Sequence, residues 1–491
     1  MTSPIPNDLF VGNEWTPASG DRRFSVLNPA TGKEYASIAD ANRQDTARAI
    51  DAAAAAASSW AELPHSQRAR LMTKVADAIE ARQMDFVAAL SQEGGAWFGK
   101  GMFETAYASG VYRAAAAAAY QVEGEILPSD YGKISMVSRQ PLGVVTVISP
   151  WNFPLLLSSR GLAFAVAIGN TVVLKPSEET PVSGGLLLAE AFAEAGVPEG
   201  VLNVVTCSRD SVAEVGDELV ANSKVKAVSF TGSTPVGKKI AAHAGSLLKK
   251  ACVELGGKDA LIILNDADME RAVNAATFGK FMHQGQICMA VERIIVHNDI
   301  KDEFTDKLVT NVQKLQMGNP DDKANVLGPI INQKQLDNIH SQVTEAVEQG
   351  ATLLTGGKFE GLFYEPTVLT NVKSDMSVFK DETFGPVAPI IGFSDVDEAL
   401  EIANDSEYGL SAGIITRNEE LGLALARQLQ TGMVHINDSS VNDEPHIPFG
   451  GVKDSGLGRH GGKWSIDTFS ETRWITLDRG QRLYPPPFNM G

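Results

Sequence analysis

Cysteine is scarce in this chain, and its scarcity excludes a disulfide framework. The 491 residues contain only Cys207, Cys252 and Cys288, too few and too scattered for one. No C-x-x-C pair and no Cys/His spacing typical of zinc is present, so we expect no metal. This cysteine usage fits a reducing compartment, and the N-terminus shows no basic-then-apolar signal sequence. We therefore expect a cytoplasmic protein.

Long apolar runs and an excess of positive charge are also missing. No stretch approaches the roughly 18 apolar residues that a membrane span needs, so no membrane partner is expected. The chain has 42 basic and 60 acidic residues, a net charge of −18, which argues against nucleic acid as a partner. A hydrophobic fraction of 44% and a charged fraction of 21% are typical of a globular protein. At this length we expect two or three domains.

What the chain does have is a regular alternation of strand-like and helix-like segments. Apolar runs rich in valine and isoleucine, joined by helical segments, predict a parallel doubly wound sheet of the α/β class. The runs of the first set lie at 143–149, 171–176, 201–206 and 225–232. A second set predicts a second domain of similar architecture, at 260–264, 293–297, 388–393, 411–416 and 432–437. Segments 121–141 and 469–477 break the alternation and predict a small extra sheet that could pair with another subunit.

Polar residues just after the strands are the candidates for function, because such sheets bind ligands beyond the carboxyl ends of their strands. Asn152 follows the first strand between two prolines that fix the local backbone. Its amide could stabilise negative charge on a carbonyl oxygen, although a turn-forming asparagine explains it equally simply. Lys175 and Glu178 follow the second strand, where they could contact a ribose and disfavour a 2′-phosphate. For Glu178 the alternative is complementing a helix dipole.

Two further strands end in candidate residues. Gly232 and Ser233 open a glycine turn into a helix with proline in its first turn, which suits an anion such as pyrophosphate or a simple helix cap. Glu254 ends the next apolar strand, where burial would raise the pKa of its carboxyl and make it a base near neutral pH. Cys252, on the same strand, we interpret as packing.

Cys288 lies between a helical segment and a strand. Free cysteine is often a buried hydrophobic residue, yet the thiolate is also an intrinsically strong nucleophile. His283 lies five positions earlier in a glycine-containing segment without defined geometry toward the thiol, and we interpret it as structural. Local sequence alone therefore does not decide the role of Cys288.

Seven motifs together resemble the NAD(P)-dependent aldehyde dehydrogenase superfamily over nearly the whole chain. They are SPWNFP, KPSEETP, FTGSTPVG, ELGGKD, GQICM, ETFGPV and PFGGVKDSGLGR, in the order and spacing of that family. The resemblance implies that Cys288 attacks the aldehyde carbonyl. It also implies that the Asn152 amide and the Cys288 backbone N–H hold the oxyanion, and that Glu254 activates the hydrolytic water.

The resemblance also implies a cofactor site, domain limits and an oligomer. Lys175 and Glu178 match contacts to the adenosine ribose, Trp151, Gly232 and Ser233 lie beside the pyrophosphate, and Glu382 and Phe384 lie at the nicotinamide ribose. We expect NAD, with NADP possible. The expected domains are 1–122 with 142–254 for NAD(P) binding, 255–465 for catalysis, and 123–141 with 466–491 as an oligomerisation extension. A homodimer or homotetramer follows.

The substrate pocket is expected to be mostly apolar, which favours an aromatic or medium-chain aldehyde. Its expected walls are Phe153, Leu156, Leu157, Arg160, Ile287, Met289 and Phe449. The chain looks most like the benzaldehyde, vanillin and salicylaldehyde branch, and Arg160 could meet a ring hydroxyl or form a salt bridge at the pocket rim. The alternatives are an aliphatic or succinic-semialdehyde dehydrogenase, a CoA-acylating enzyme, which Glu254 argues against, and a non-catalytic member.

Overall fold

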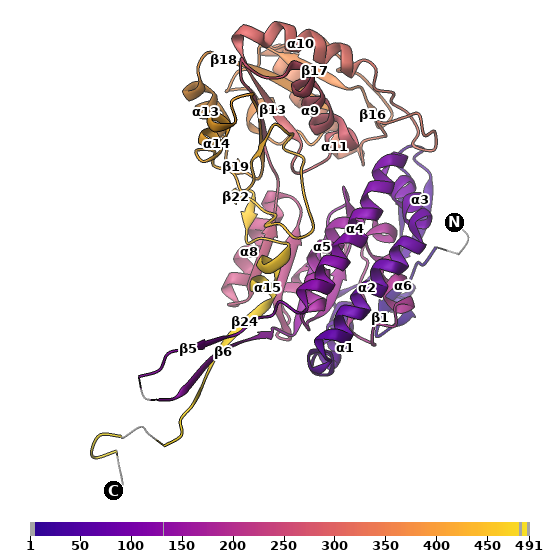
Figure 1. Ribbon diagram of the computed structural model, residues 1–491. Coiled ribbons are helices and arrows are strands. Elements are labelled where there is room, and N and C mark those ends of the chain that lie inside the picture. The colour runs from indigo at the N-terminus through magenta and orange to yellow at the C-terminus, as the bar shows by residue number, and fades with distance from the viewer. Residues whose placement is uncertain (1–4, 131, 481–483, 489–491) are drawn as a thin grey trace.

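The computed structural model describes residues 5–130, 132–480 and 484–488. Two open sheets with helices on both faces stand one above the other, and a narrow β arm projects from the lower one (Figure 1). Parts of the predicted domain ranges, at 1–4, 131, 481–483 and 489–491, lie outside the described residues. No described helix is both long enough and apolar enough to span a membrane.

The first sheet has eight strands in the order β2-β1-β9-β8-β7-β10-β11-β23. Its five central strands are parallel. Because the chain order reverses between β7 and β10, a crevice forms there beyond the strand ends, where such sheets bind ligands. The strands are β1 Leu9–Val11, β2 Glu14–Thr16, β7 Val144–Ile148, β8 Thr171–Lys175, β9 Leu202–Val204, β10 Val225–Thr231, β11 Lys250–Glu254 and β23 Gly456–Leu457.

The second sheet has seven strands in the order β14-β17-β18-β13-β12-β20-β21. All neighbours are parallel except β14 and β17. Its strands are β12 Asp259–Ile263, β13 Val291–His297, β14 Thr352–Thr355, β17 Thr367–Thr370, β18 Val387–Phe393, β20 Ala412–Ile415 and β21 His435–Ile436. Three two-stranded sheets complete these domains: β3 Arg23–Leu27 with β4 Glu34–Ala39, β15 Phe359–Glu360 with β16 Phe363–Tyr364, and β19 Tyr408–Gly409 with β22 Val452–Lys453.

The projecting arm is a third, antiparallel sheet of β5 Glu125–Leu127, β6 Ile134–Pro141 and β24 Ser470–Leu477. β24 pairs with β6 along its full length, which joins two segments more than three hundred residues apart. Ile126 and Trp474 are 80% and 70% exposed on the arm. The arm therefore carries apolar side chains that its own sheet does not cover.

Helices bury the two faces of each main sheet. Every residue of α5 is buried, as expected for a helix that is apolar all round, and α4 packs against both α2 and α5. The first domain holds α1 Arg43–Glu62, α2 His65–Ala81, α3 Gln83–Gly94, α4 Phe98–Ala118, α5 Pro154–Ala167, η2 Val182–Leu186, α6 Leu187–Glu194, α7 Val212–Ala221 and α8 Thr234–Ser246. The remaining helices are η1 Ser19–Asp21, α9 Met269–Phe281, η3 Met282–Gly285, α10 Asn298–Val312, α11 Gln333–Glu348, α12 Ser377–Lys380, α13 Val396–Asn404, α14 Glu419–Ala426 and α15 Gly462–Phe469.

The predicted α/β class, with two doubly wound sheets and a β extension, is confirmed. The sequence did not predict the antiparallel edges, where β1, β2 and β23 extend the first sheet and β14 extends the second. These edge strands have two to four residues, which is too short for an alternation pattern to be read. The last strand predicted in the second sheet, 432–437, is limited to β21, and Phe469, predicted as the first residue of the extended segment 469–477, is the last residue of α15.

Candidate active site

Two cavities meet at Cys288. The larger, of about 590 Å³, opens between the two main sheets beyond the ends of β7, β10 and β11. The smaller, of about 170 Å³, lies between α4, α5 and the Cys288 loop. Asn152, Leu157 and Cys288 line both cavities. The predicted nucleophile and oxyanion donor therefore lie at the passage between a larger and a smaller binding space.

A strained turn presents Cys288 to this passage. His283 and Gln284 have φ values of 49° and 56°, and Gly285 continues the left-handed run at 71°. A Cβ on Gly285 would collide with the Gly385 carbonyl, so only glycine fits there. The Gln284 amide donates to the Pro329 carbonyl at 3.0 Å. Such strain persists only where the surroundings over-determine the backbone.

The Asn152 amide is fixed from the same loop. Its Nδ2 donates to the Gln286 carbonyl oxygen at 3.0 Å, and the contact is buried. An amide nitrogen carries two protons, so a second N–H remains beside Cys288. The Cys288 backbone N–H donates to no backbone carbonyl within the described ranges. Two donors are thus available next to the thiol, as an oxyanion site requires.

Glu254 and Cys288 are close neighbours with unusual acidities. Burial raises the pKa of Glu254 to about 7, and the Cys288 thiol and Arg160 offset part of the rise. Burial also raises the pKa of the Cys288 thiol well above its ordinary value, and the Glu254 carboxyl adds to that. Neither Glu254 oxygen has a hydrogen-bond partner of ordinary geometry in the described part of the chain. A carboxyl with these properties is poised to accept a proton near neutral pH.

Cys288 differs from the other two cysteines in its exposure. Cys207 and Cys252 are buried, whereas Cys288 is partly exposed. The Cys252 sulfur lies 3.5 Å from Nε2 of His460, and burial raises the pKa of that thiol to about 12. Both observations agree with the interpretation of Cys252 as packing.

His283 is a buried residue of this turn, and it is not placed to act as a base. Neither of its ring nitrogens has a hydrogen-bond partner among the described residues, and its ring meets Phe153 edge-on at 5.5 Å. Burial, together with the nearby Lys100, lowers its pKa well below the ordinary histidine value. A histidine held neutral in this way fits the structural role that the sequence predicted.

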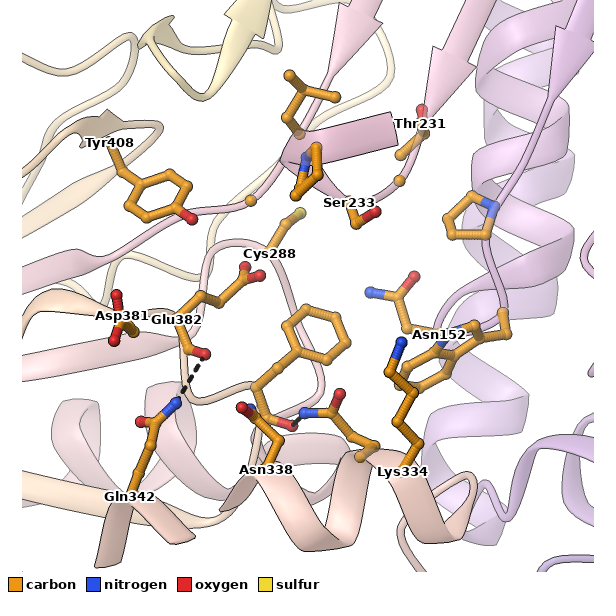
Figure 2. Close-up of a pocket in the computed structure, with 18 of the residues that line it drawn as sticks. Asn152, Thr231, Ser233, Cys288, Lys334, Asn338, Gln342, Asp381, Glu382 and Tyr408 are labelled. Carbon is orange, nitrogen blue, oxygen red and sulfur yellow. Dashed lines mark hydrogen bonds between the residues drawn. The ribbon is translucent and has the colours of Figure 1, made fainter. Parts of the chain in front are cut away.

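The larger cavity gathers most of the predicted cofactor residues. Trp151, Gly232, Ser233, Glu382 and Phe384 all line it (Figure 2). Lys175 and Glu178 do not line it. They form an ion pair with each other, with Nζ of Lys175 3.4 Å from Oε2 of Glu178. Burial raises the pKa of Glu178, but the charge of Lys175 acts against this effect and the pKa is lowered.

One wall of this cavity was missed from the sequence. It is the face of α11 that carries Lys334, Gln335, Asn338, Ser341, Gln342 and Glu345. These residues recur at helical spacing, but polar residues on a helix usually mean a solvated face, so the pattern gave no functional signal. Figure 2 shows Gln342 rising from this helix on the side of the cavity that carries Glu382, and Lys334 on the side that carries Asn152, with Asn338 between them.

The residues of the larger cavity fit a dinucleotide. The 13-residue helix α8 begins there, and its N-cap Ser233 makes no side-chain cap. Its first N–H groups are therefore available to an anion such as pyrophosphate. Trp151 and Phe384 pack edge-on at 5.4 Å, which leaves flat apolar surface for a ring. The Glu382 carboxyl can accept hydrogen bonds from ribose hydroxyls.

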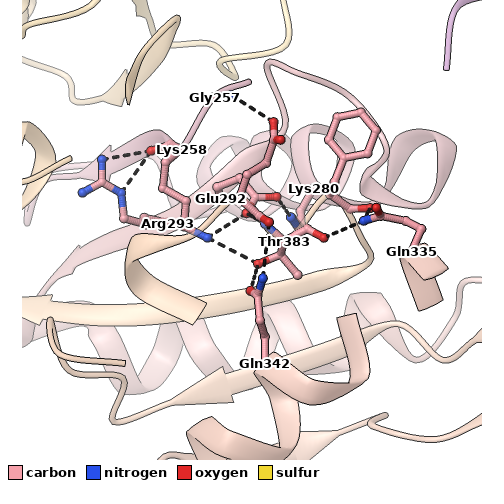
Figure 3. A network of polar contacts seen from close by, with 10 residues as sticks. Gly257, Lys258, Lys280, Glu292, Arg293, Gln335, Gln342 and Thr383 are labelled. Atoms are coloured by element: carbon pink, nitrogen blue, oxygen red, sulfur yellow. Dashed lines mark hydrogen bonds and ion pairs between the residues drawn. The ribbon is translucent and has the colours of Figure 1, made fainter. Parts of the chain in front are cut away.

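A buried ion cluster holds the segment that carries Glu382 and Phe384. Glu292 accepts from Lys258 at 2.8 Å and from Lys280 at 2.6 Å, and all three side chains are fully buried. Glu292 also accepts a third hydrogen bond, from the Thr383 backbone N–H at 2.9 Å (Figure 3). Although burial alone would raise it, the two lysines bring the pKa of Glu292 down to about 2. The cluster thus fixes the backbone between Glu382 and Phe384.

Glu292→Gln is expected to lower the free energy of unfolding by about 3–5 kcal/mol, because it leaves two buried lysines without their counter-charge. Urea unfolding followed by circular dichroism measures the change. The matched control is Glu303→Gln, which removes an exposed ion pair with Lys307 and should cost less than about 1 kcal/mol. Equal stability of the two variants would contradict a structural role for the cluster.

The smaller cavity contains all seven residues predicted for the substrate pocket: Phe153, Leu156, Leu157, Arg160, Ile287, Met289 and Phe449. Arg160 forms an ion pair with Asp443, and its guanidinium carbon lies 3.8 Å from the Phe449 ring centroid. The sequence left two roles open for Arg160, a contact to a ring hydroxyl of the substrate and a salt bridge at the pocket rim. The structure contains the salt bridge.

Several walls of this cavity were not predicted. They are Phe103 and Tyr107 on α4, Phe278 and Met282 near the end of α9, and Val441, Asn442 and Asp443 in a C-terminal loop, of which only the loop region was anticipated. Phe103 and Tyr107 occur in an alanine-rich helix that the sequence presents only as a packing element. No local signal distinguishes a pocket aromatic from a core aromatic there.

A crevice at the switch point of a doubly wound sheet, opening onto a cysteine, defines a class: an oxidoreductase that uses a nicotinamide dinucleotide. The family model described as "Aldehyde dehydrogenase family" matches residues 15–475. The chain therefore belongs to the aldehyde dehydrogenase family, and it is an aldehyde oxidoreductase with a nicotinamide cofactor.

Individual relatives extend over nearly the whole chain. The chain is 44% identical over 484 residues to a benzaldehyde dehydrogenase (NAD(+)) of Pseudomonas putida, covering 98% of both chains. It is 45% identical over 479 residues to a vanillin dehydrogenase of an Amycolatopsis species, covering 97% of both. A crystal structure of a salicylaldehyde dehydrogenase from Pseudomonas putida G7 complexed with salicylaldehyde superimposes with a TM-score of 0.96 at 38% identity, covering 98% of this chain and 100% of that one.

Proposed function

We propose that this protein oxidises an aromatic aldehyde of the benzaldehyde type to its carboxylic acid, with NAD as the preferred cofactor. The observation that carries the proposal is the smaller cavity, whose walls include the rings of Phe103, Phe153, Phe278 and Phe449 and which ends at Cys288. Its volume of about 170 Å³ lies below the roughly 300–1,000 Å³ of pockets for drug-sized ligands, so it suits a single ring. The names of the relatives support the same substrate class.

Catalysis begins with the thiol. The Cys288 thiol releases its proton to water in the larger cavity, and its sulfur attacks the aldehyde carbon as the thiolate. The second N–H of Asn152 and the Cys288 backbone N–H donate to the carbonyl oxygen as it gains charge. Bound nicotinamide supplies the hydride acceptor for the oxidation.

Hydrolysis of the resulting thioester completes the cycle. Glu254 takes a proton from water, the hydroxide adds to the acyl carbon, and the Cys288 sulfur leaves as the thiolate and takes up the proton that Glu254 holds. Neither buried Glu254 oxygen has a partner of ordinary geometry among the described residues, so a carboxylate oxygen is available to that water. A carboxyl in this position supports hydrolysis over transfer of the acyl group to CoA.

The remaining assignments are proposals that rest on position. Residues 1–122 and 142–254 would bind the cofactor, 255–465 would carry the catalytic thiol, and 123–141 with 466–491 would form the subunit contact of a homodimer or homotetramer. The exposed Ile126 and Trp474 of the arm support that contact. The Lys175–Glu178 pair supports NAD over NADP, because a carboxylate there disfavours a 2′-phosphate. The cysteine usage supports a cytoplasmic location.

The test is a substrate panel. We expect kcat/KM with NAD to be highest for benzaldehydes, lower for medium-chain aliphatic aldehydes and lowest for succinic semialdehyde. Arg160, the cation that a distal carboxylate would need, is already paired with Asp443. Each aldehyde is run with NAD and with NADP. A semialdehyde turned over faster than every benzaldehyde would overturn the substrate class, and faster turnover with NADP would overturn the cofactor preference.

The rate should rise with pH through the pKa of Glu254. The carboxylate form is the active base, and burial places the pKa of this group at about 7, so kcat should fall about tenfold per pH unit below that value and level off above it. Stopped-flow or steady-state rates between about pH 5.5 and 9 measure the profile. The decrease in kcat below pH 7 should disappear in Glu254→Gln. A wild-type kcat that stays constant across pH 7 would contradict the assignment of Glu254 as the base.

Asn152→Ala should lower kcat/KM by about 10²–10³-fold, since it removes one oxyanion donor. The binding of NAD, measured by fluorescence titration, should change far less, because the remaining walls of the larger cavity are intact. A loss of activity of less than about tenfold would show that Asn152 stabilises the Cys288 loop, through its hydrogen bond to the Gln286 carbonyl, and does not stabilise the oxyanion.

A further inference from the structure

Three polar side chains cluster at one place in the smaller cavity, whose other walls are mostly apolar. They are Tyr107 of α4, Arg160 of α5 and Asp443 of the C-terminal loop. Asp443 uses Oδ2 for its ion pair with Arg160, and the two side chains are 9% and 8% exposed. Arg160 is held on its other side by the Phe449 ring. One nitrogen of the guanidinium is therefore paired with Asp443, and this pair holds the Asp443 carboxylate in the pocket wall.

Two polar atoms of this cluster have no protein partner. The Tyr107 hydroxyl and Oδ1 of Asp443 are both buried and make no hydrogen bond to any described residue. Buried polar atoms are normally paired, and leaving one unpaired is unfavourable. The other polar side chain of the loop in this cavity, Asn442, differs, because its amide donates to Asp438 at 3.1 Å. The partners of Tyr107 and Asp443 must therefore enter the cavity, as water or as part of a ligand.

The cluster lies close to the reaction centre. Burial lowers the pKa of the Arg160 guanidinium, and its electrostatic interactions with Tyr107, Glu254 and Cys288 partly offset that effect. Arg160 therefore lies near both the Tyr107 hydroxyl and the catalytic pair. Tyr107, Asp443 and Cys288 line one cavity of about 170 Å³, so a ring whose carbonyl lies at Cys288 shares that cavity with Tyr107 and Asp443.

The two atoms differ in what they can bind. A carboxylate oxygen only accepts hydrogen bonds, whereas a tyrosine hydroxyl both donates and accepts. Burial raises the pKa of Tyr107, so that its hydroxyl keeps its proton. One ring hydroxyl satisfies both atoms, by donating to Oδ1 of Asp443 and accepting from Tyr107. A methoxy group has no proton for Asp443, and an unsubstituted ring leaves both atoms unpaired.

We propose that Tyr107 and Asp443 form a hydroxyl-binding subsite that makes hydroxylated benzaldehydes the preferred substrates, with Arg160 as the positioning residue for Asp443. The subsite rests on the proposed aromatic-aldehyde function and specifies its substrate class.

The first experiment compares kcat/KM of the wild-type enzyme with NAD for benzaldehyde, the three hydroxybenzaldehydes and the three matching methoxybenzaldehydes. We expect the best hydroxy isomer to exceed both benzaldehyde and its own methoxy counterpart by at least about tenfold, because a site built to bind a hydroxyl rejects analogues that leave its polar atoms unpaired. Equal values for the three compounds would overturn the subsite.

The second experiment uses Tyr107→Phe and Asp443→Asn. Each should lower the ratio of kcat/KM for the best hydroxy isomer over that for benzaldehyde by at least about fivefold. Tyr107→Phe removes one oxygen and keeps the ring, so it remains informative even if Asp443→Asn folds poorly. The matched control is Phe278→Leu, which changes an apolar wall of the same cavity and should lower both rates by the same factor. A ratio kept in both variants would overturn the subsite.

Failure of the subsite and failure of the proposed function give different results. If benzaldehyde and its derivatives are all oxidised at similar rates, the aromatic function stands and the subsite is wrong. If no benzaldehyde is oxidised while aliphatic aldehydes are, the aromatic function itself is wrong.

Discussion

Cys288→Ala is expected to abolish aldehyde oxidation, lowering kcat by at least about 10⁴-fold, as removal of a catalytic nucleophile does. The alanine removes only the sulfur from the passage between the two cavities. The larger cavity keeps its other walls, so the Kd for NAD, measured by fluorescence titration, should stay within about threefold of wild type. Initial rates of NADH formation measure the loss.

Cys207→Ala is the matched control for this variant. Cys207 is a buried thiol of the first domain, and burial raises its pKa to about 11, which makes it an unreactive core residue. Its replacement should leave turnover in place. Turnover of Cys288→Ala at a rate similar to that of Cys207→Ala would contradict covalent catalysis at Cys288.

Glu254→Gln is expected to separate the two halves of the reaction. The glutamine keeps the size of the side chain but cannot accept a proton from water, so hydrolysis of the thioester should slow by about 10²–10⁴-fold. Mixing the variant with NAD and benzaldehyde in a stopped-flow instrument should give a burst of NADH close to one per active site, followed by slow turnover. Wild-type steady-state rates without a burst would assign the base to another residue.

The sequence predicted the parts of the site that follow strands. Asn152, Gly232, Ser233 and Glu254 each stand at the carboxyl end of a predicted strand, and the alternation of strands and helices brings those ends to one edge of the sheet. Lys175 and Glu178 obey the same rule, yet they lie outside the larger cavity, because a strand end fixes only the edge of the sheet and not the reach of a side chain. Their contact to a cofactor stays a prediction.

The parts that could not be predicted depend on packing between distant segments. Tyr107 and Asp443 lie more than three hundred positions apart, and only the packing of α4 beside the C-terminal loop brings them to one cavity. The ion pair of Arg160 with Asp443 likewise joins distant segments, so the sequence could suggest a salt bridge for Arg160 but not its partner. The left-handed backbone at His283 and Gln284 also escaped prediction, because few non-glycine residues of any type adopt that conformation.

The central claim is that the acyl group passes through the sulfur of Cys288. The most direct measurement is mass spectrometry of Glu254→Gln, quenched in acid after mixing with NAD and benzaldehyde and then digested. We predict that one benzoyl group is found on the peptide that contains Cys288, and that it is absent when NAD is omitted. A benzoyl group on another residue, or no covalent adduct while NADH is formed, would contradict the account.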